Sequence, residues 1–259
     1  RDEIGLSWSL MRAHWQAYKK RLDSLPQNDT GTSLTREKMI FPLLGELGYE
    51  ISKQKARQVG GKSYAISHSA ANRDHFPIHI MGYNDHLDKR RESGKPRLSP
   101  HALVQEYLNN TEHLYALVTN GRQLRLLRDA TRLVRMSYLE FDLQRMFEEE
   151  RYADFSLLYR LLHISRMPER IDSGPESVIE YYHQESMASG TRIRERLSDA
   201  VENSIKTLAN GFLSHQKNES LTAQFADSSL QPDLYYTYLL RLIYRLLFLI
   251  VIEERKLIY

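Results

Sequence analysis

The hydrophobic pattern of this chain changes once, near residue 143, and the change restricts the folds open to it. Before this point, segments with helical spacing of apolar side chains alternate with short runs typical of strands. After it the strand signals stop, and apolar residues recur every three or four positions. We therefore predict an α/β unit over residues 1–167, a linker at 168–175 and an all-helical unit over residues 176–259.

The first unit is predicted to contain two helices followed by three strands, in the ranges 6–25, 35–47, 49–52, 63–67 and 76–81. Ser99 and Pro100 predict the start of the next helix, because serine caps a helix N-terminus and proline fits its first turn. A strand over 114–119 follows. Asn120 and Gly121 then predict a hairpin with a type I′ turn, which needs positive φ at both central residues. Strands over 123–127 and 133–141 complete the predicted α/β unit.

The second unit is predicted to be helical, with a long helix from about residue 191 and a last helix over 233–255. Residues 246–252 of the last helix are apolar on nearly all sides, which is typical of a buried helix. We expect them to pack against apolar side chains of the long helix, namely Ile193, Leu197, Val201, Ile205 and Phe212.

Composition excludes several classes of protein. The chain has 259 residues, of which 41% are hydrophobic, which is enough for a core. It has no cysteine, so disulfides, zinc–thiolate sites and cysteine nucleophiles are excluded. No uncharged apolar run reaches 18 residues, and Arg241 and Arg245 interrupt the last helix, so we expect a cytoplasmic protein that does not engage a membrane. The chain begins without Met and stops within a helical pattern, so we expect a piece of a longer protein.

The predicted order of helix, three strands, helix and strand resembles the core of the PD-(D/E)xK nuclease fold. That fold binds Mg²⁺ through an Asp on its second strand and an acidic residue on its third, and a Lys two positions later orients the water. Here residues 61–67 contain no Asp, and residues 78–84 contain neither an acidic residue nor a Lys. We therefore predict a degenerate nuclease-like core with no catalytic residue at the usual positions.

Acidic residues just beyond the third predicted strand leave one alternative open. Asp85, Asp88 and Lys89 follow it closely, and Glu46 lies near the end of the preceding helix. They are either solvated charges or a displaced site that binds Mg²⁺. In the second case the chain is an active Mg²⁺-dependent endonuclease.

Two basic clusters are candidates for contacts with DNA phosphates. The first is a basic loop with five cations: Lys89, Arg90, Arg91, Lys95 and Arg97. The second lies on the predicted meander: Arg122, Arg125, Arg128, Arg132 and Arg135. Such contacts depend on charge and read little sequence. The alternative for both clusters is an ordinary solvated surface.

The histidines do not predict a metal site. His68, His75, His79 and His86 lie close together in the sequence, but no HExxH or HxxxH pair falls on one predicted helix. We expect scattered surface histidines and no metal ligands among them.

Five segments together resemble a known family. They are residues 41–49 (FPLLGELGY), 104–108 (VQEYL), 116–126 (ALVTNGRQLRL), 138–143 (YLEFDL, followed by ADF at 153–155) and 242–255 (LIYRLLFLIVIEER). Their order and spacing are similar to the N-terminal region of large bacterial adenine-specific restriction-modification methyltransferases. That group includes type IIG and type IIL enzymes and the methylases of DISARM-like phage-defence systems.

The resemblance implies a nuclease-like fold and a role in antiviral defence. The glycine-rich S-adenosylmethionine loop and the Asn-Pro-Pro-Tyr motif of the family are absent here, so the resemblance places S-adenosylmethionine and methylation in a domain beyond Tyr259. We expect no cofactor in this chain, unless the endonuclease alternative brings Mg²⁺. The leading hypothesis is a DNA-engaging region that does not cleave. A third hypothesis is an assembly module that binds other phage-defence proteins.

Overall fold

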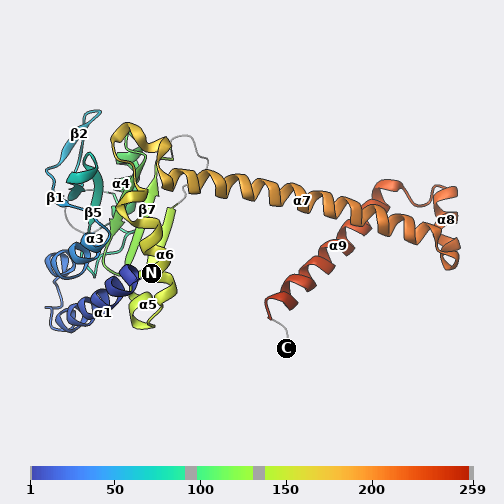
Figure 1. Cartoon of the computed structure of the whole chain (residues 1–259). Coiled ribbons are helices and arrows are strands. Elements are labelled where there is room, and N and C mark those ends of the chain that lie inside the picture. Colours follow the sequence, from blue (N-terminus) through green and yellow to red (C-terminus); the bar gives the residue numbers. More distant parts are fainter. Residues whose placement is uncertain (1, 91–97, 131–137, 257–259) are drawn as a thin grey trace. The chain divides into compact units, whose positions relative to one another are not determined.

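The computed structural model describes residues 2–90, 98–130 and 138–256. It divides the chain into two compact units, Arg1–His183 and Gln184–Tyr259, and Figure 1 labels their elements. The division falls within helix α7 (Val178–Ser214), whereas the sequence pattern placed it at residues 168–175. The segment Ile171–Glu176 forms a short 3-10 turn.

The first unit is built on a six-stranded mixed sheet with the strand order β1-β4-β5-β6-β7-β8 (Figure 1). The strands are β1 (Ile51–Lys53), β4 (His68–Ala70), β5 (Phe76–Ile80), β6 (Tyr115–Thr119), β7 (Gln123–Arg128) and β8 (Tyr138–Asp142). Among the described strands only β5 and β6 pair in parallel, and helix α4 (Pro100–Asn109) lies between them in the chain. The predicted combination of an α/β unit with a helical C-terminal region is confirmed.

The second predicted strand, 63–67, is divided in the structure. Its first residues belong to β3 (Lys62–Tyr64), which pairs with β2 (Arg57–Val59) in a separate hairpin. The strand that enters the sheet, β4, starts one residue after the predicted range. Gly60 and Gly61 make the hairpin turn, with φ of 55° and 78°.

The predicted helix over 35–47 contains a π-helical turn. It runs through α2 (Thr32–Thr35), a π-turn at Arg36–Ile40 and α3 (Phe41–Glu46). Pro42 lies two residues after the end of the π-turn, and its missing N–H cannot continue the regular hydrogen-bond pattern.

The central strands of the sheet are buried on both faces. On one face, Leu117 belongs to the core shared with α1 (Asp2–Leu22), α3, α5 (Leu143–Glu148) and α6 (Tyr152–Leu162). On the other face, Ala116 and Val118 pack with α4 and with Tyr64 of the β2–β3 hairpin. Such strands read as continuous apolar runs, as residues 114–119 do.

The second unit contains α7 beyond residue 183, α8 (Glu219–Ala226) and α9 (Pro232–Glu254). Its small core consists of Ile205, Leu239 and Ile243, with Val201 packed against them. The expected packing of residues 246–252 forms at Leu247, which packs against the core that contains Ile205, but most of this segment is exposed. Phe248 is 65% exposed and Ile250 59%, and Ile193 on α7 is 64% exposed. The contacts between α7 and α9 are confined to the segment around the small core, so most of the apolar surface of α9 is uncovered within the described residues.

Among the described residues, α9 is also the one helix that is long and apolar enough to cross a membrane. This criterion considers length and composition alone, and helices in the cores of soluble proteins also meet it. Arg241 and Arg245 lie inside α9. The expected absence of membrane contact stays a prediction.

Candidate nucleic-acid interface

The turn after β6 is built around the buried side chain of Asn120. Its Oδ1 accepts hydrogen bonds from the backbone N–H groups of Arg122 at 3.0 Å and Gln123 at 2.9 Å. Its Nδ2 donates to the carbonyl oxygen of Asp85 at 2.9 Å. Asn120 therefore closes its own turn and also holds the loop that follows β5.

This turn is not the predicted type I′ hairpin. Gly121 has a φ of 81°, but Asn120 is absent from the positive-φ residues of the described chain. Thr119 pairs with Leu124 and β7 begins at Gln123, so residues 120–122 connect the two strands. A Cβ on Gly121 would lie 2.7 Å from Cγ2 of Thr35, so both the backbone conformation and the packing require glycine there.

Arg122 lies in a cluster of cations around an aromatic ring. Its guanidinium carbon is 5.2 Å from the ring centroid of Tyr83, and the Nζ of Lys19 is 5.6 Å from the same centroid. Lys19 also forms an ion pair with Glu148 at 3.0 Å. Cations attracted to one ring in this way are held near each other. The sequence analysis missed Lys19 and Tyr83, because nothing local connects α1 with the loop after β5.

Arg125, predicted to contact phosphate, is instead buried, with 3% of its surface exposed. Its Nη1 and Nη2 donate to Asp88 at 2.6 Å and 2.8 Å, and its Nε donates to Glu140 at 2.5 Å. The hydrogen bond from Arg125 lowers the pKa of Asp88. Because strand residues alternate between faces, Arg125 points to the α4 side, where His101 accepts a further bond at 3.0 Å. We therefore remove Arg125 from the candidate interface.

Arg128 is also held by an acidic partner. Its Nε and Nη2 donate to Glu180 at 2.9 Å and 2.8 Å, and the hydroxyl of Tyr115 donates to the same carboxylate at 2.5 Å. This network ties β6 and β7 to the first turn of α7. Arg132 and Arg135, which complete the second predicted cluster, lie outside the described residues.

The residues of the displaced metal site do not form a metal-binding group. Asp85 accepts the N–H of Gly82 at 2.9 Å, Asp88 is bound to Arg125, and Glu46 accepts the hydroxyl of Ser7 at 2.5 Å. Across residues 2–90, 98–130 and 138–256, no three His, Asp or Glu side chains are placed to hold one metal ion.

The sequence analysis predicts histidines at the surface, but in the structure some are exposed and others are buried. His75 and His86 are exposed, but His68 is 1% exposed and His79 is 7% exposed. Burial, with a contribution from Arg36, lowers the pKa of His68 from 6.5 to about 4. Its Nδ1 lies 2.8 Å from the hydroxyl of Ser67. His68 is therefore a neutral core residue at physiological pH.

The first basic loop is described only at its beginning. Lys89 and Arg90 are exposed, whereas Arg91, Lys95 and Arg97 lie outside the described residues. Because β5 and β6 are parallel, their C-terminal ends lie at the same edge of the sheet. The loop with Lys89 and Arg90 and the turn with Arg122 therefore leave the sheet at one edge.

Comparisons with protein-family models, with curated proteins and with solved structures find no match for this chain.

Proposed function

We propose that this chain is the DNA-engaging, non-cleaving N-terminal region of a bacterial phage-defence adenine methyltransferase. The observation that carries the proposal is the topology of the first unit. Helix α3 leads into three antiparallel strands, β1, β4 and β5, and α4 then crosses to the parallel strand β6. Apart from the inserted β2–β3 hairpin, this order agrees with the one that the sequence resemblance implies, and it supports the proposal of a nuclease-like core.

The edge at the C-terminal ends of β5 and β6 is the surface we assign to DNA. Open parallel α/β sheets bind ligands beyond the carboxyl ends of their strands, and we apply this rule to the parallel pair β5 and β6. Lys89 and Arg90 are exposed on the loop that leaves the sheet at this edge after β5, and Arg122 is partly exposed beside Tyr83. Cations that meet phosphates bind without reading bases, so the expected binding is weak, sequence-independent and sensitive to salt.

The main test is DNA affinity over a salt series for the whole chain and for the double variant Lys89→Ala/Arg90→Ala. Each lost phosphate contact lowers the slope of log affinity against log salt by about 0.9, so the slope should fall by roughly 1–2 units. The matched control is Arg194→Ala/Arg196→Ala, which changes the net charge equally on an exposed stretch of α7. An unchanged slope in the first variant would remove Lys89 and Arg90 from the interface.

The non-cleaving part of the proposal rests on the carboxylates. Mg²⁺ needs several oxygen ligands, and β4 and β5 carry no Asp or Glu. We expect no Mg²⁺- or Mn²⁺-dependent cleavage of plasmid DNA. Cleavage that Asp85→Ala or Asp88→Ala abolishes would support the endonuclease hypothesis instead. If the chain binds no DNA even at low salt, the assembly hypothesis replaces the proposal.

A further inference from the structure

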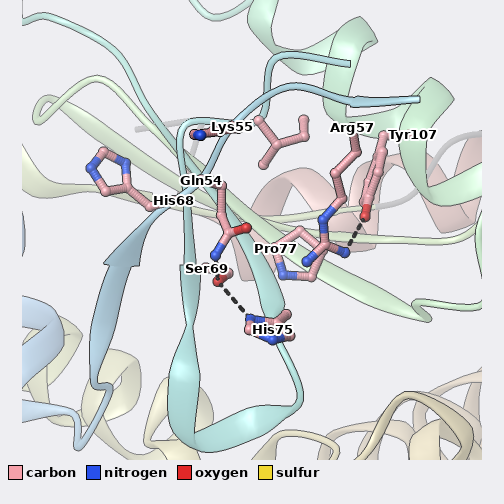
Figure 2. Close-up of a pocket in the computed structure, with 9 residues that line it drawn as sticks. Gln54, Lys55, Arg57, His68, Ser69, His75, Pro77 and Tyr107 are labelled. Atoms are coloured by element: carbon pink, nitrogen blue, oxygen red, sulfur yellow. Dashed lines mark hydrogen bonds between the residues drawn. The ribbon is translucent and has the colours of Figure 1, made fainter. Parts of the chain in front are cut away.

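A shallow recess lies beside the outer strands of the sheet, between β1, β4, β2 and α4. Figure 2 shows the polar side chains that line it, which are Gln54, Lys55, Arg57, His68, Ser69, His75 and Tyr107. The recess has a volume of about 200 Å³ including its open mouth, and its enclosed part is about the size of one water molecule. The interior therefore has room for about one water-sized atom.

The cations of this recess have no acidic partner. Arg57 donates from Nη1 to the hydroxyl of Tyr107 at 3.2 Å, the bond drawn at the right of Figure 2. No Asp or Glu lines the recess, and within the described residues neither Arg57 nor Lys55 forms an ion pair. By contrast, Lys62 on the same β2–β3 hairpin is paired with Glu106 at 2.9 Å. The hairpin thus neutralises one of its cations and leaves another unpaired beside the recess.

The remaining polar side chains of the recess form hydrogen bonds with one another. Gln54 donates from Nε2 to the hydroxyl of Ser69 at 2.7 Å, and the Nδ1 of His75 lies 3.5 Å from the same hydroxyl. His75 is exposed and has a φ of 59°, a conformation uncommon for a residue with a side chain. The ring of His68 points away from this group in Figure 2. The recess therefore presents cations and hydrogen-bond donors around a space the size of one oxygen atom.

We propose that this recess is a phosphate-binding site that takes one backbone phosphate of a nucleic acid. The inference rests on the proposed function and extends it from the edge with Lys89 and Arg122 to the outer strands. Pockets for small molecules enclose about 300–1,000 Å³, so this one is too small for a nucleoside. One phosphate oxygen fits the interior, with the Arg57 guanidinium supplying charged donors.

The open mouth of the recess also favours a polymer over a free anion. A single phosphate bound at an open mouth replaces contacts with water by similar contacts with the protein, so it gains little binding free energy. In a nucleic acid, neighbouring phosphates can contact the other cations, namely Lys89, Arg90 and Arg122. Each further contact then forms within the same complex and adds to the affinity.

The test compares two single variants of one hairpin, Arg57→Ala and Lys62→Ala, in the whole chain. DNA affinity is measured over a salt series. We expect Arg57→Ala to lower the slope of log affinity against log salt by roughly 0.9 and Lys62→Ala to leave it nearly unchanged. Arg57→Lys, which keeps the charge, should restore most of the slope. Unfolding midpoints followed by tryptophan fluorescence exclude a loss of folding as the cause.

Three results would overturn the inference. If Arg57→Ala leaves the slope unchanged while Lys89→Ala/Arg90→Ala lowers it, the recess is not a contact, although the proposed function stands. If the parent chain binds no DNA at low salt, both fail together. In NMR titrations at constant pH, a His75 imidazole signal that moves with inorganic phosphate but not with a 12-base-pair duplex would identify a free-anion site.

Discussion

Replacing Asn120 with alanine should destabilise the first unit by about 2–4 kcal/mol. The side chain is fully buried and makes three hydrogen bonds to backbone groups, at 2.9–3.0 Å. Each such bond contributes about 0.5–1.5 kcal/mol net, and a buried group left without a partner costs more. The N–H groups of Arg122 and Gln123 lose this acceptor, and the carbonyl of Asp85 keeps the longer bond from the Arg122 Nη2 at 3.4 Å, so the total cost exceeds that of one bond.

The assay uses the two tryptophans of the chain, Trp8 and Trp15, which both lie in the first unit. Each ring stacks on Phe147, at 5.5 Å and 5.4 Å between centroids, so their fluorescence follows the unfolding of this unit. Urea titrations of parent and Asn120→Ala give the difference in the free energy of unfolding.

The control is Asn28→Ala, in an exposed turn, which should change the free energy of unfolding by less than about 0.5 kcal/mol. A similarly small change for Asn120→Ala would refute the reasoning, because it would mean that the three bonds are not made. Hydrogen exchange offers a second measurement. The loop at residues 82–88 should exchange faster in Asn120→Ala, since it loses the bond to the carbonyl of Asp85.

The remaining predictions use the same measurement of unfolding. Gly121→Ala should cost about 2–4 kcal/mol, whereas Gly61→Ala, with a similar positive φ but open space, should cost only about 1–2. The pKa of His68 in the folded state is lowered from 6.5 to about 4. The contribution of His68 to the free energy of unfolding is therefore complete above pH 6.5, and up to about 3 kcal/mol is lost as the pH falls from 6.5 toward 4. His68→Gln should flatten that dependence, and an equally steep fall in the variant would assign it to other groups. In the second unit, followed by circular dichroism, Leu239→Ala should cost about 2–4 kcal/mol and the exposed Leu249→Ala less than about 0.5.

The sequence predicted an element well where the residues of that segment alone indicate its structure. Ser99 caps α4 as expected, because its hydroxyl accepts the N–H of Ala102 at 3.2 Å. The runs predicted at 76–81 and 114–119 became β5 and β6 almost unchanged. Where the signal was ambiguous, the prediction failed. The long helix α7 starts at Val178 rather than near residue 191, since the mostly polar stretch 183–190, which ends in Gly190, interrupts its apolar pattern.

The composition and periodicity of the sequence determined that the chain forms an α/β unit followed by helices, because burial patterns repeat with the period of each element. They also determined where cations occur, but not what each cation does. Arg122 and Arg125 are three residues apart in the chain. One is partly exposed beside Tyr83, and the other is enclosed by Asp88, 37 residues away in sequence. Only the tertiary structure decided this, since a buried charge needs a partner that folding brings from a distant segment.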